Sequence, residues 1–481
     1  MAARVHGQSD FSVLANPIVT VGETNRVLYD KFTSFEEDQT LFEYFLVKGV
    51  AYVIQTSRSG NGSPVKQCLN LDVVPHVNSI VAALNSAKAV SSIVAADGSK
   101  HPCPREDSFK VEVNGIQFGV CFSASSGFTM FGEDLDIKVK YLEKHVAIPE
   151  LAHDESHSDC KSVASPSPVT SIGKSFLTGD PILDEERSLD GAFDLVVGGK
   201  CTCLSTPRPC IFLHGLGVLK EKKNNTNFHE YWGNISEHSP CCSSMHYAQL
   251  NTVNNSWTSH IQQQKVCDRV MAVSETSDGS TISDTIIVTH SMGGLMMAGA
   301  LANKKCKLAS SSTWVSTAAP MFGSMASDYF QASCKAETNV FMEKFAQSTK
   351  LCPPDDGIKS LAYMNESYSN PWLDKQFKAA QRAFRKNVYA VMCSDSFSGI
   401  LSIYQAGFWI LGTVVSHKSL SNDGMVEYIS CAGGFPPSKF SNNYRDRFYV
   451  TQLNHHDMAF RGGDALLDSS KMPLKWFECL M

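Results

Sequence analysis

The sequence predicts an α/β domain with a mostly parallel sheet flanked by helices, preceded by a β-rich N-terminal domain. The chain has 481 residues, of which 43% are apolar, and this exceeds what one hydrophobic core usually organises. In the second half, strand-like runs alternate with helical patterns, which is typical of parallel strands joined by crossover helices. In the first half, strand-like runs follow one another. We therefore expect two domains, residues 1–175 and 176–481.

The N-terminal domain has the pattern of β structure and contains no catalytic motif. Segments such as FKVEVNGIQFGVCFSA and LDIKVKYL alternate apolar and polar residues, and VNSIVAALNSAKAV is the one helical pattern. The polar stretch HDESHSDCKSVASPSPVTS, residues 153–171, has the composition of a linker or long loop. This stretch places the domain boundary near residue 175.

Five strand-like runs mark the sheet of the second domain. They are PCIFLHG, DTIIVTHS, STWVSTAAP, NVYAVMCSD and RFYVTQLNHH. Ligands of such sheets bind beyond the carboxyl ends of the strands, so polar residues at those ends are candidates for a site. Residues 326–386 interrupt the alternation with a helical DKQFKAAQRAFRKN segment and cysteines of their own. We expect this insertion to form a cap.

Ser291 stands where the strand TIIVT runs into the helical segment MGGLMMAGALANKK. A serine on such a sharp strand-to-helix turn is exposed above the sheet, and small residues after it let the helix approach the strand. Thr289 occupies the position of the first glycine in the G-x-S-x-G pattern, but this position still belongs to the strand. The alternative is a structural serine in an ordinary turn. A nucleophile needs a base and an oxyanion site from elsewhere in the chain.

Three further segments, each after or near a strand, supply candidate partners. CIFLHGLG ends a strand in His-Gly, SLSNDGMVEY carries Asp423, and TQLNHHDMAF carries His455 and His456. Each segment alone is also compatible with a purely structural role, because Asp-Gly turns are common in surface loops and the chain has 15 histidines. The order Ser291, Asp423, His455 is nevertheless the order of a hydrolase triad.

These segments resemble the landmarks of secreted lipases of the Pseudomonas and Burkholderia type, in the α/β-hydrolase superfamily. The similar islands are FLHGLG, YWGNI, THSMGG, STAAPMFGSMASDY, NDGMV and LNHHDM, spread over residues 205–465. The resemblance implies an α/β-hydrolase fold and hydrolysis of carboxylic esters such as acylglycerols, without an organic cofactor. Ser291 would be the nucleophile, His455 the base, Asp423 the residue that orients it, and the Leu216 and Met292 amides the oxyanion hole.

The same resemblance implies a structural calcium near the catalytic histidine. Asp457 matches one ligand position, but a second matching carboxylate is missing from the motif. The apolar segment GILSIYQAGFWILGTVV, residues 399–415, is too short to span a membrane and contains Ser402, Gln405 and Thr413. We expect it to be buried core packing. The alternative is an acyl-binding face in contact with a lipid interface.

Composition limits the partners and the compartment. A net charge of −6 and a pI near 6.2 give no basic footprint for nucleic acid, apart from KEKK at 220–223. The 16 cysteines occur in close pairs such as CTC and CC and favour disulfides over thiols buried in a cytosolic protein. Glycosylation sequons occur at Asn224, Asn234, Asn254 and Asn365, and at Asn61 in a weaker, proline-followed form.

We therefore expect a secreted protein. The sequence MAARVHGQSD has no apolar leader, so a signal peptide is absent from this chain. The load of cysteines and sequons resembles a secreted eukaryotic relative, of the oomycete kind. Two other functions stay open: a different acyl transfer on the same triad, as in an amidase, thioesterase or lipid acyltransferase, and a binding protein without catalysis on a hydrolase fold.

Overall fold

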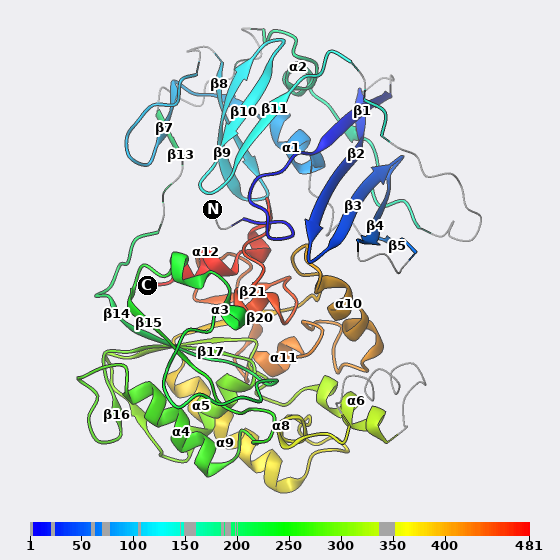
Figure 1. Ribbon diagram of the computed structural model, residues 1–481. Helices are drawn as coiled ribbons and strands as arrows, with labels where there is room; N and C mark the ends of the chain where they lie inside the picture. The colour runs from blue at the N-terminus through cyan, green and yellow to red at the C-terminus, as the bar shows by residue number, and fades with distance from the viewer. Residues whose placement is uncertain are drawn as a thin grey trace. The chain divides into compact units, whose positions relative to one another are not determined.

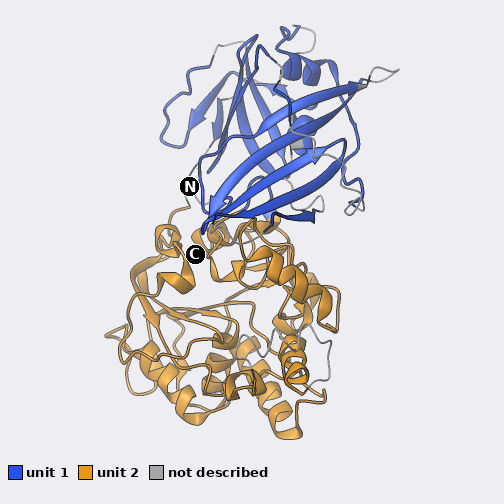
Figure 2. Ribbon diagram, turned by 45° about the vertical axis from the view of Figure 1, so that its right-hand side comes forward, with its two compact units in different colours: residues 1–200, 465–469 blue, residues 201–464, 470–481 orange. Residues whose placement is uncertain are grey.

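The computed structural model divides into two compact units, which Figure 2 shows in different colours: Met1–Lys200 with Ala465–Ser469, and Cys201–Asp464 with Ser470–Met481. It describes residues 3–20, 25–58, 63–69, 77–103, 107–144, 146–148, 160–183, 187, 194–197, 199, 201–335 and 352–481. The division falls later than residue 175. Helix α2 (Ser171–Thr178) belongs to the first unit because its Phe176 ring packs against Phe109, Phe122 and Phe128.

The first unit contains two antiparallel sheets. One has the order β1 (Leu14–Thr20), β2 (Arg26–Glu37), β3 (Thr40–Val47), β4 (Val50–Ser57), β5 (Val65–Cys68), with β12 (Ser167–Pro168) on β2. The other has the order β11 (Asp136–Lys140), β10 (Gly127–Phe131), β9 (Ile116–Ser123), β8 (Ser108–Val113), β6 (Lys88–Ala89). Helix α1 (Val77–Leu84) and the parallel pair of β7 (Ser92–Ala95) and β13 (Asp194–Val197) complete it. The β-rich character expected from the alternating pattern is present.

The second unit is built on a six-stranded sheet. Its order is β15 (Cys242–Ala248), β14 (Arg208–Leu213), β17 (Ile286–His290), β19 (Thr313–Thr317), β20 (Ala390–Ser394), β21 (Phe448–Thr451), and every neighbouring pair is parallel. The five strand-like runs of the sequence correspond to five of these strands. Central parallel strands are covered on both faces, which explains their continuous apolar runs. The expected parallel α/β sheet is confirmed.

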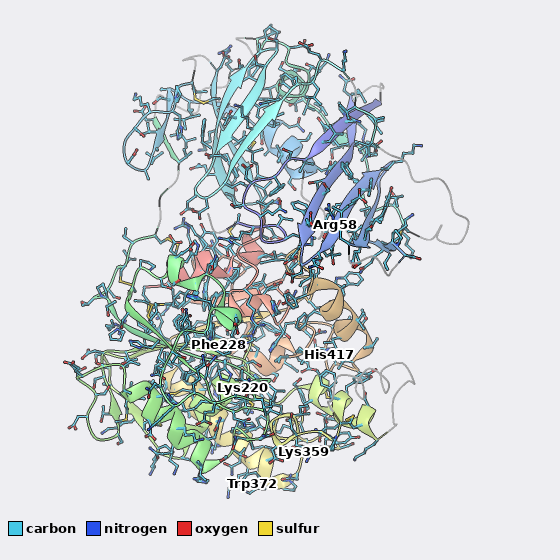
Figure 3. The ribbon with its side chains drawn as sticks, viewed as in Figure 1. Arg58, Lys220, Phe228, Lys359, Trp372 and His417 are labelled. Atoms are coloured by element: carbon cyan, nitrogen blue, oxygen red, sulfur yellow. A yellow bond between two sulfur atoms is a disulfide. The ribbon has the colours of Figure 1, made fainter. Side chains whose placement is uncertain are left out.

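Helices cover the sheet of the second unit. Figure 1 shows α4 (His260–Met271), α5 (Met292–Ala302) and α9 (Pro371–Asn387) grouped together beside the sheet. Phe377 and Phe384 of α9 are fully buried and contact Trp257 and Trp314. Trp372, labelled in Figure 3, lies in the first turn of the same helix and is exposed. Helix α9 therefore belongs to the layer that covers the sheet, whereas the cap was expected to extend to residue 386.

The remaining elements of the second unit are short. They are α3 (His229–Trp232), η4 (Ile235–His238), β16 (Thr281–Ile282), β18 (Lys307–Leu308), α6 (Met325–Cys334), α8 (Asp356–Ser360), α10 (Gln405–Val414), α11 (Tyr428–Cys431), η5 (Pro437–Lys439), η6 (Asp457–Ala459), η7 (Ser469–Lys471) and α12 (Pro473–Glu478). Residues 336–351 of the expected cap lie outside the described residues. Among the described residues, no helix is both long and apolar enough to cross a membrane.

Helix α10 corrects the expectation that residues 399–415 are buried core. Gln405 is the buried residue of this helix, whereas Ile410 is 47% and Val414 36% exposed. Apart from Gln405 and Thr413 the helix carries no polar side chain, and neighbouring residues cover one of its faces. Phe408 packs against Gly424 and Gly412 packs against Phe397 on that covered face. The other face meets solvent.

Eight disulfides pair all sixteen cysteines, as the close spacing of the cysteines predicted. The pairs are Cys68–Cys160, Cys103–Cys121, Cys201–Cys479, Cys203–Cys241, Cys210–Cys242, Cys267–Cys306, Cys334–Cys352 and Cys393–Cys431. The sequon asparagines Asn224, Asn234, Asn254 and Asn365 are all exposed. Asn61 lies outside the described residues.

Candidate active site

Ser291 lies on a sharp turn between β17 and α5. Its backbone has a φ of 55°, in the left-handed region, and its amide donates to the Thr317 carbonyl oxygen at 2.9 Å. Helix α5 passes very close to strand β14 here. A Cβ on Gly293 would lie 2.4 Å from the Leu213 carbonyl oxygen, so only glycine permits this approach. The strained serine and the small residues after it therefore form the turn that the sequence predicted.

Thr289 shows why the turn tolerates a residue other than glycine. This residue belongs to β17 and is fully buried. Its hydroxyl accepts a hydrogen bond from Trp314 Nε1 at 3.0 Å and donates to the Val315 carbonyl oxygen at 3.4 Å. The side chain thus points along the sheet toward β19 and leaves the turn at Ser291 free.

The structure brings Ser291, His455 and Asp423 into one hydrogen-bonded line. His455 Nε2 lies 2.9 Å from Ser291 Oγ, and His455 Nδ1 lies 2.8 Å from Asp423 Oδ2. An ionised carboxylate only accepts hydrogen bonds, so Nδ1 carries the proton and Nε2 accepts the serine hydroxyl proton. The other oxygen, Asp423 Oδ1, accepts the amides of Met425 and Val426 at 2.9 and 2.7 Å. The carboxylate therefore has a fixed orientation.

The neighbouring His456 faces away from Ser291. Its ring stacks on Tyr404 with ring centroids 3.9 Å apart, and Phe408 of α10 lies beyond at 6.3 Å. Burial lowers the pKa of His456 below its usual value of 6.5. In the sequence, only the register of the LNHHDM motif indicated which of the two adjacent histidines is the base. The geometry places His455, and not His456, against the serine.

Gly215 brings the loop after β14 onto the candidate nucleophile. A Cβ on Gly215 would lie 2.6 Å from the Cβ of Ser291. The Gly215 carbonyl oxygen accepts two hydrogen bonds, from His214 Nδ1 at 2.8 Å and from Thr252 Oγ1 at 2.9 Å. Because a trans peptide is planar, the Leu216 N–H points away from that anchored carbonyl. The direction of the Leu216 amide is therefore fixed by the side chains of His214 and Thr252.

The amides of Leu216 and Met292 are available to a ligand. In the part of the chain that the structure describes, neither amide donates to another protein group. Met292 is the first residue of α5, where amides have no acceptor inside the helix and the helix dipole favours negative charge. Both candidate oxyanion donors thus lie on segments that adjoin Ser291.

The side chain of His214 links the same loop to Leu250. Its Nδ1–H donates to Gly215, so in the neutral ring Nε2 accepts the Leu250 amide at 3.0 Å. Burial lowers the pKa of His214 to about 4, because the charged ring would lose its hydration. Only the neutral ring can make both hydrogen bonds at once, because Nε2 must be unprotonated to accept the Leu250 amide.

A buried acid behind the Asp423 turn was missed in the sequence. Glu427 is fully buried, and its Oε1 lies 2.7 Å from Nδ1 of His417, which Figure 3 labels near the end of α10. Asn422 pairs with Glu427 across the turn, and the Asp423 amide donates to the Val426 carbonyl oxygen at 3.0 Å. This pair joins the end of α10 to the acid loop. A glutamate directly after the apolar pair Met425 and Val426 was the signal available in the sequence.

The residues around Asp457 do not fit a calcium ion. Asp457 is fully buried, and its Oδ2 accepts the Ile400 amide at 2.8 Å. The Asn454 side-chain oxygen accepts a hydrogen bond from the Asp457 amide. The Asn454 Nδ2 and Asp457 Oδ2 both lie close to Gly399, and an amide nitrogen is a donor that cannot ligate a cation. Among the described residues, no group of three or more His, Cys, Asp or Glu side chains could hold a metal.

Comparison with known proteins gives weak structural likenesses. No protein-family model matches the chain, and no curated protein matches it. Among solved structures, a Staphylococcus hyicus lipase is 14% identical, with a TM-score of 0.28, over 57% of this chain and 95% of that one. A metagenomic carboxyl esterase is 15% identical, with a TM-score of 0.34, over 62% and 80%. Lipase 1 from Pelosinus fermentans is 14% identical, with a TM-score of 0.30, over 57% and 98%.

Proposed function

We propose that this chain is a serine hydrolase that cleaves carboxylic esters, a lipase or esterase. The observation that carries the proposal is the unbroken hydrogen-bonded line from Asp423 through His455 to Ser291 Oγ. A serine hydroxyl is a weak nucleophile until an oriented base can take its proton. All three side chains are at most slightly exposed, so the proton transfer would take place out of bulk water.

In the proposed reaction, Ser291 Oγ attacks the ester carbonyl carbon while its proton moves to His455 Nε2. The imidazolium that results is stabilised by Asp423, whose carboxylate stays ionised and fixed by two backbone amides. His455 then returns the proton to the leaving alkoxide. Water attacks the acyl-enzyme in a second round, with His455 again as the base.

The oxyanion of each tetrahedral intermediate would be bound by the Leu216 and Met292 amides. Donors that are fixed before the reaction stabilise developing charge without reorganisation, and one such donor contributes about 3 kcal/mol. The double anchoring of the Gly215 carbonyl and the start of α5 supply this rigidity. No metal takes part in these steps as proposed.

The surroundings favour esters with apolar acyl groups. No charged side chain occurs in the sequence between Asp395 and His417, a stretch that includes α10. Tyr404, Ile410 and Val414 of this stretch are between 36% and 47% exposed, and Tyr404 stacks on the residue that follows the base. We propose that this uncharged face contacts lipid-like substrate and, with it, a lipid interface.

The test is a panel of p-nitrophenyl esters of increasing acyl length, combined with a fluorophosphonate probe. The wild-type protein should turn over esters and label at Ser291, and Ser291→Ala should lose labelling and about six orders of magnitude of turnover. Labelling without ester turnover would indicate another acyl transfer. Absence of both, in a protein that is folded, would indicate a binding protein and contradict the proposal.

We also propose that the protein is secreted. The eight disulfides and the exposed positions of four sequon asparagines support an oxidising compartment. Intact mass before and after enzymatic deglycosylation, with the protein expressed in a eukaryotic secretory host, tests the sequons. Unmodified mass and free thiols in protein purified from its natural source would contradict the proposal.

A further inference from the structure

A second line of hydrogen bonds, outside the triad, joins the three loops that meet at Ser291. The Gly215 amide donates to Tyr231 Oη at 2.8 Å, and Tyr231 Oη lies 2.7 Å from His290 Nδ1. His290 Nε2 lies 3.0 Å from the backbone carbonyl oxygen of His455. The line therefore runs from the loop after β14, through the residue next to the nucleophile, to the backbone of the candidate base.

Donor and acceptor roles are determined at every step of this line. The His455 carbonyl oxygen can only accept, so His290 Nε2 carries a proton. In the neutral ring Nδ1 is then unprotonated and accepts a hydrogen bond from the Tyr231 hydroxyl. The Tyr231 oxygen in turn accepts the Gly215 amide. A single arrangement of protons satisfies all four groups, and the opposite tautomer of His290 would place the unprotonated Nε2 against the His455 carbonyl oxygen, two acceptors facing each other.

The surroundings hold both side chains in place. Tyr231 is 8% and His290 is 3% exposed. The Arg461 guanidinium lies 4.1 Å from the centre of the Tyr231 ring, and its Nε donates to the Tyr231 carbonyl oxygen. Burial, and then the nearby His455 ring, lower the pKa of His290 well below 6.5, so the neutral ring persists.

We propose that Tyr231 and His290 are positioning residues that set the distance between the oxyanion loop and the base, an inference that rests on the proposed hydrolase function. The hydrogen bonds of these two side chains go to the Gly215 amide, to each other and to the His455 backbone, and not to Ser291 Oγ or the His455 ring nitrogens. The oxyanion donor at Leu216 follows Gly215 directly, and the base is itself the residue whose carbonyl accepts the last hydrogen bond. A shift of either loop moves a donor or a base relative to the ester carbonyl, and small displacements of this kind reduce rates strongly.

Tyr231→Phe removes the central hydroxyl and keeps the ring. Tyr247→Phe is the matched control, because the Tyr247 hydroxyl is buried and has no hydrogen-bond partner among the described residues. We expect Tyr231→Phe to lower kcat per site, titrated with fluorophosphonate, by about tenfold to a hundredfold, with little change in KM. Tyr247→Phe should leave kcat unchanged. An unchanged kcat per site in both variants would overturn the inference and indicate a merely structural hydroxyl.

Variants of His290 test whether the two residues act as one path. His290→Asn keeps an acceptor near the Nδ1 position, and His290→Gln offers a donor near the Nε2 position, so each should retain more kcat than His290→Leu. The double variant of Tyr231→Phe with His290→Leu should have a kcat only slightly lower than that of the worse single variant, because either substitution alone already interrupts the line of hydrogen bonds. Fully additive losses would contradict a shared path.

A measurement without catalysis separates this inference from the proposed function. Nitrogen-15 chemical shifts of labelled histidines should show His290 protonated at Nε2 and unprotonated at Nδ1, with the Nδ1 shift changed in Tyr231→Phe. Protonation at Nδ1 in the wild type would overturn the path while leaving ester hydrolysis intact. A wild type without turnover or labelling would instead overturn the hydrolase function, and the catalytic role of both residues with it.

Discussion

Acidification should destabilise this protein through His214, a histidine that is buried in its neutral form. Its pKa falls from 6.5 in the unfolded chain to about 4 in the folded protein, because burial opposes the charged ring. Between these two values the unfolded state binds more protons than the folded state. Stability from this group is therefore fully present above pH 6.5 and is lost as the pH falls toward 4.

The size of the effect follows from the same two pKa values. One pKa unit corresponds to about 1.4 kcal/mol, so His214 alone should cost about 2 kcal/mol of unfolding free energy between about pH 7.5 and pH 5. His290, whose pKa is also lowered by burial, adds to the loss. Asp328 acts in the opposite direction, because burial raises its pKa to about 6 and its neutral form favours the folded state below that pH.

Comparison with a variant isolates His214 from these other groups. His214→Asn removes the titrating ring and keeps a donor near the Nδ1 position for the Gly215 carbonyl. Urea unfolding at several pH values should give a gap between wild type and variant that narrows by about 2 kcal/mol from pH 7.5 to pH 5. Parallel pH curves for the two proteins would show that His214 does not titrate with a lowered pKa, and would refute the reasoning.

Three further perturbations have distinct expected results. His455→Ala should lose turnover as a triad member does, by about six orders of magnitude, whereas His456→Ala should keep most activity and lose about 1 kcal/mol with its aromatic stack; the reverse result in an ester assay would move the register by one residue. Replacing Cys393 and Cys431 with alanine opens a loop with a sequence separation of 38 and should lower the urea-unfolding free energy by about 4 kcal/mol, and an unchanged midpoint would contradict this. Gly215→Ala should lower kcat at least about tenfold in a folded protein, because the new Cβ would lie 2.6 Å from the Cβ of the serine; normal kcat would show that the loop yields.

The strand-ending residues were predictable because the sheet itself was predictable. Ser291 and His455 follow runs whose apolar, β-branched content predicts buried parallel strands, and parallel strands bring their carboxyl ends together. Asp423 needed the motif as well, since its loop follows α10 rather than a strand. The order of these residues along the chain matches that of a hydrolase triad, which is why we predicted that they meet.

Other features depend on contacts that no local pattern contains. The exposed side of α10 could not be distinguished from core packing in the sequence, because Gln405 and Thr413 are too few to mark a polar, solvent-facing side of this helix. Tyr231 stood in the YWGNI motif, yet its hydrogen bond to His290 joins residues 59 apart in sequence. The buried pair of His417 and Glu427 was also not predictable, since glutamate is usually an exposed residue.

The disulfide between Cys201 and Cys479 has a topological consequence for the second unit. It joins the first residue of that unit to a residue of the segment after α12, and the Leu204 amide donates to the Met481 carbonyl oxygen beside it at 2.8 Å. Covalently, the polypeptide from 201 to 479 is a closed ring. A protease that cuts this ring once yields a nicked but still single molecule, whose two pieces separate only after reduction.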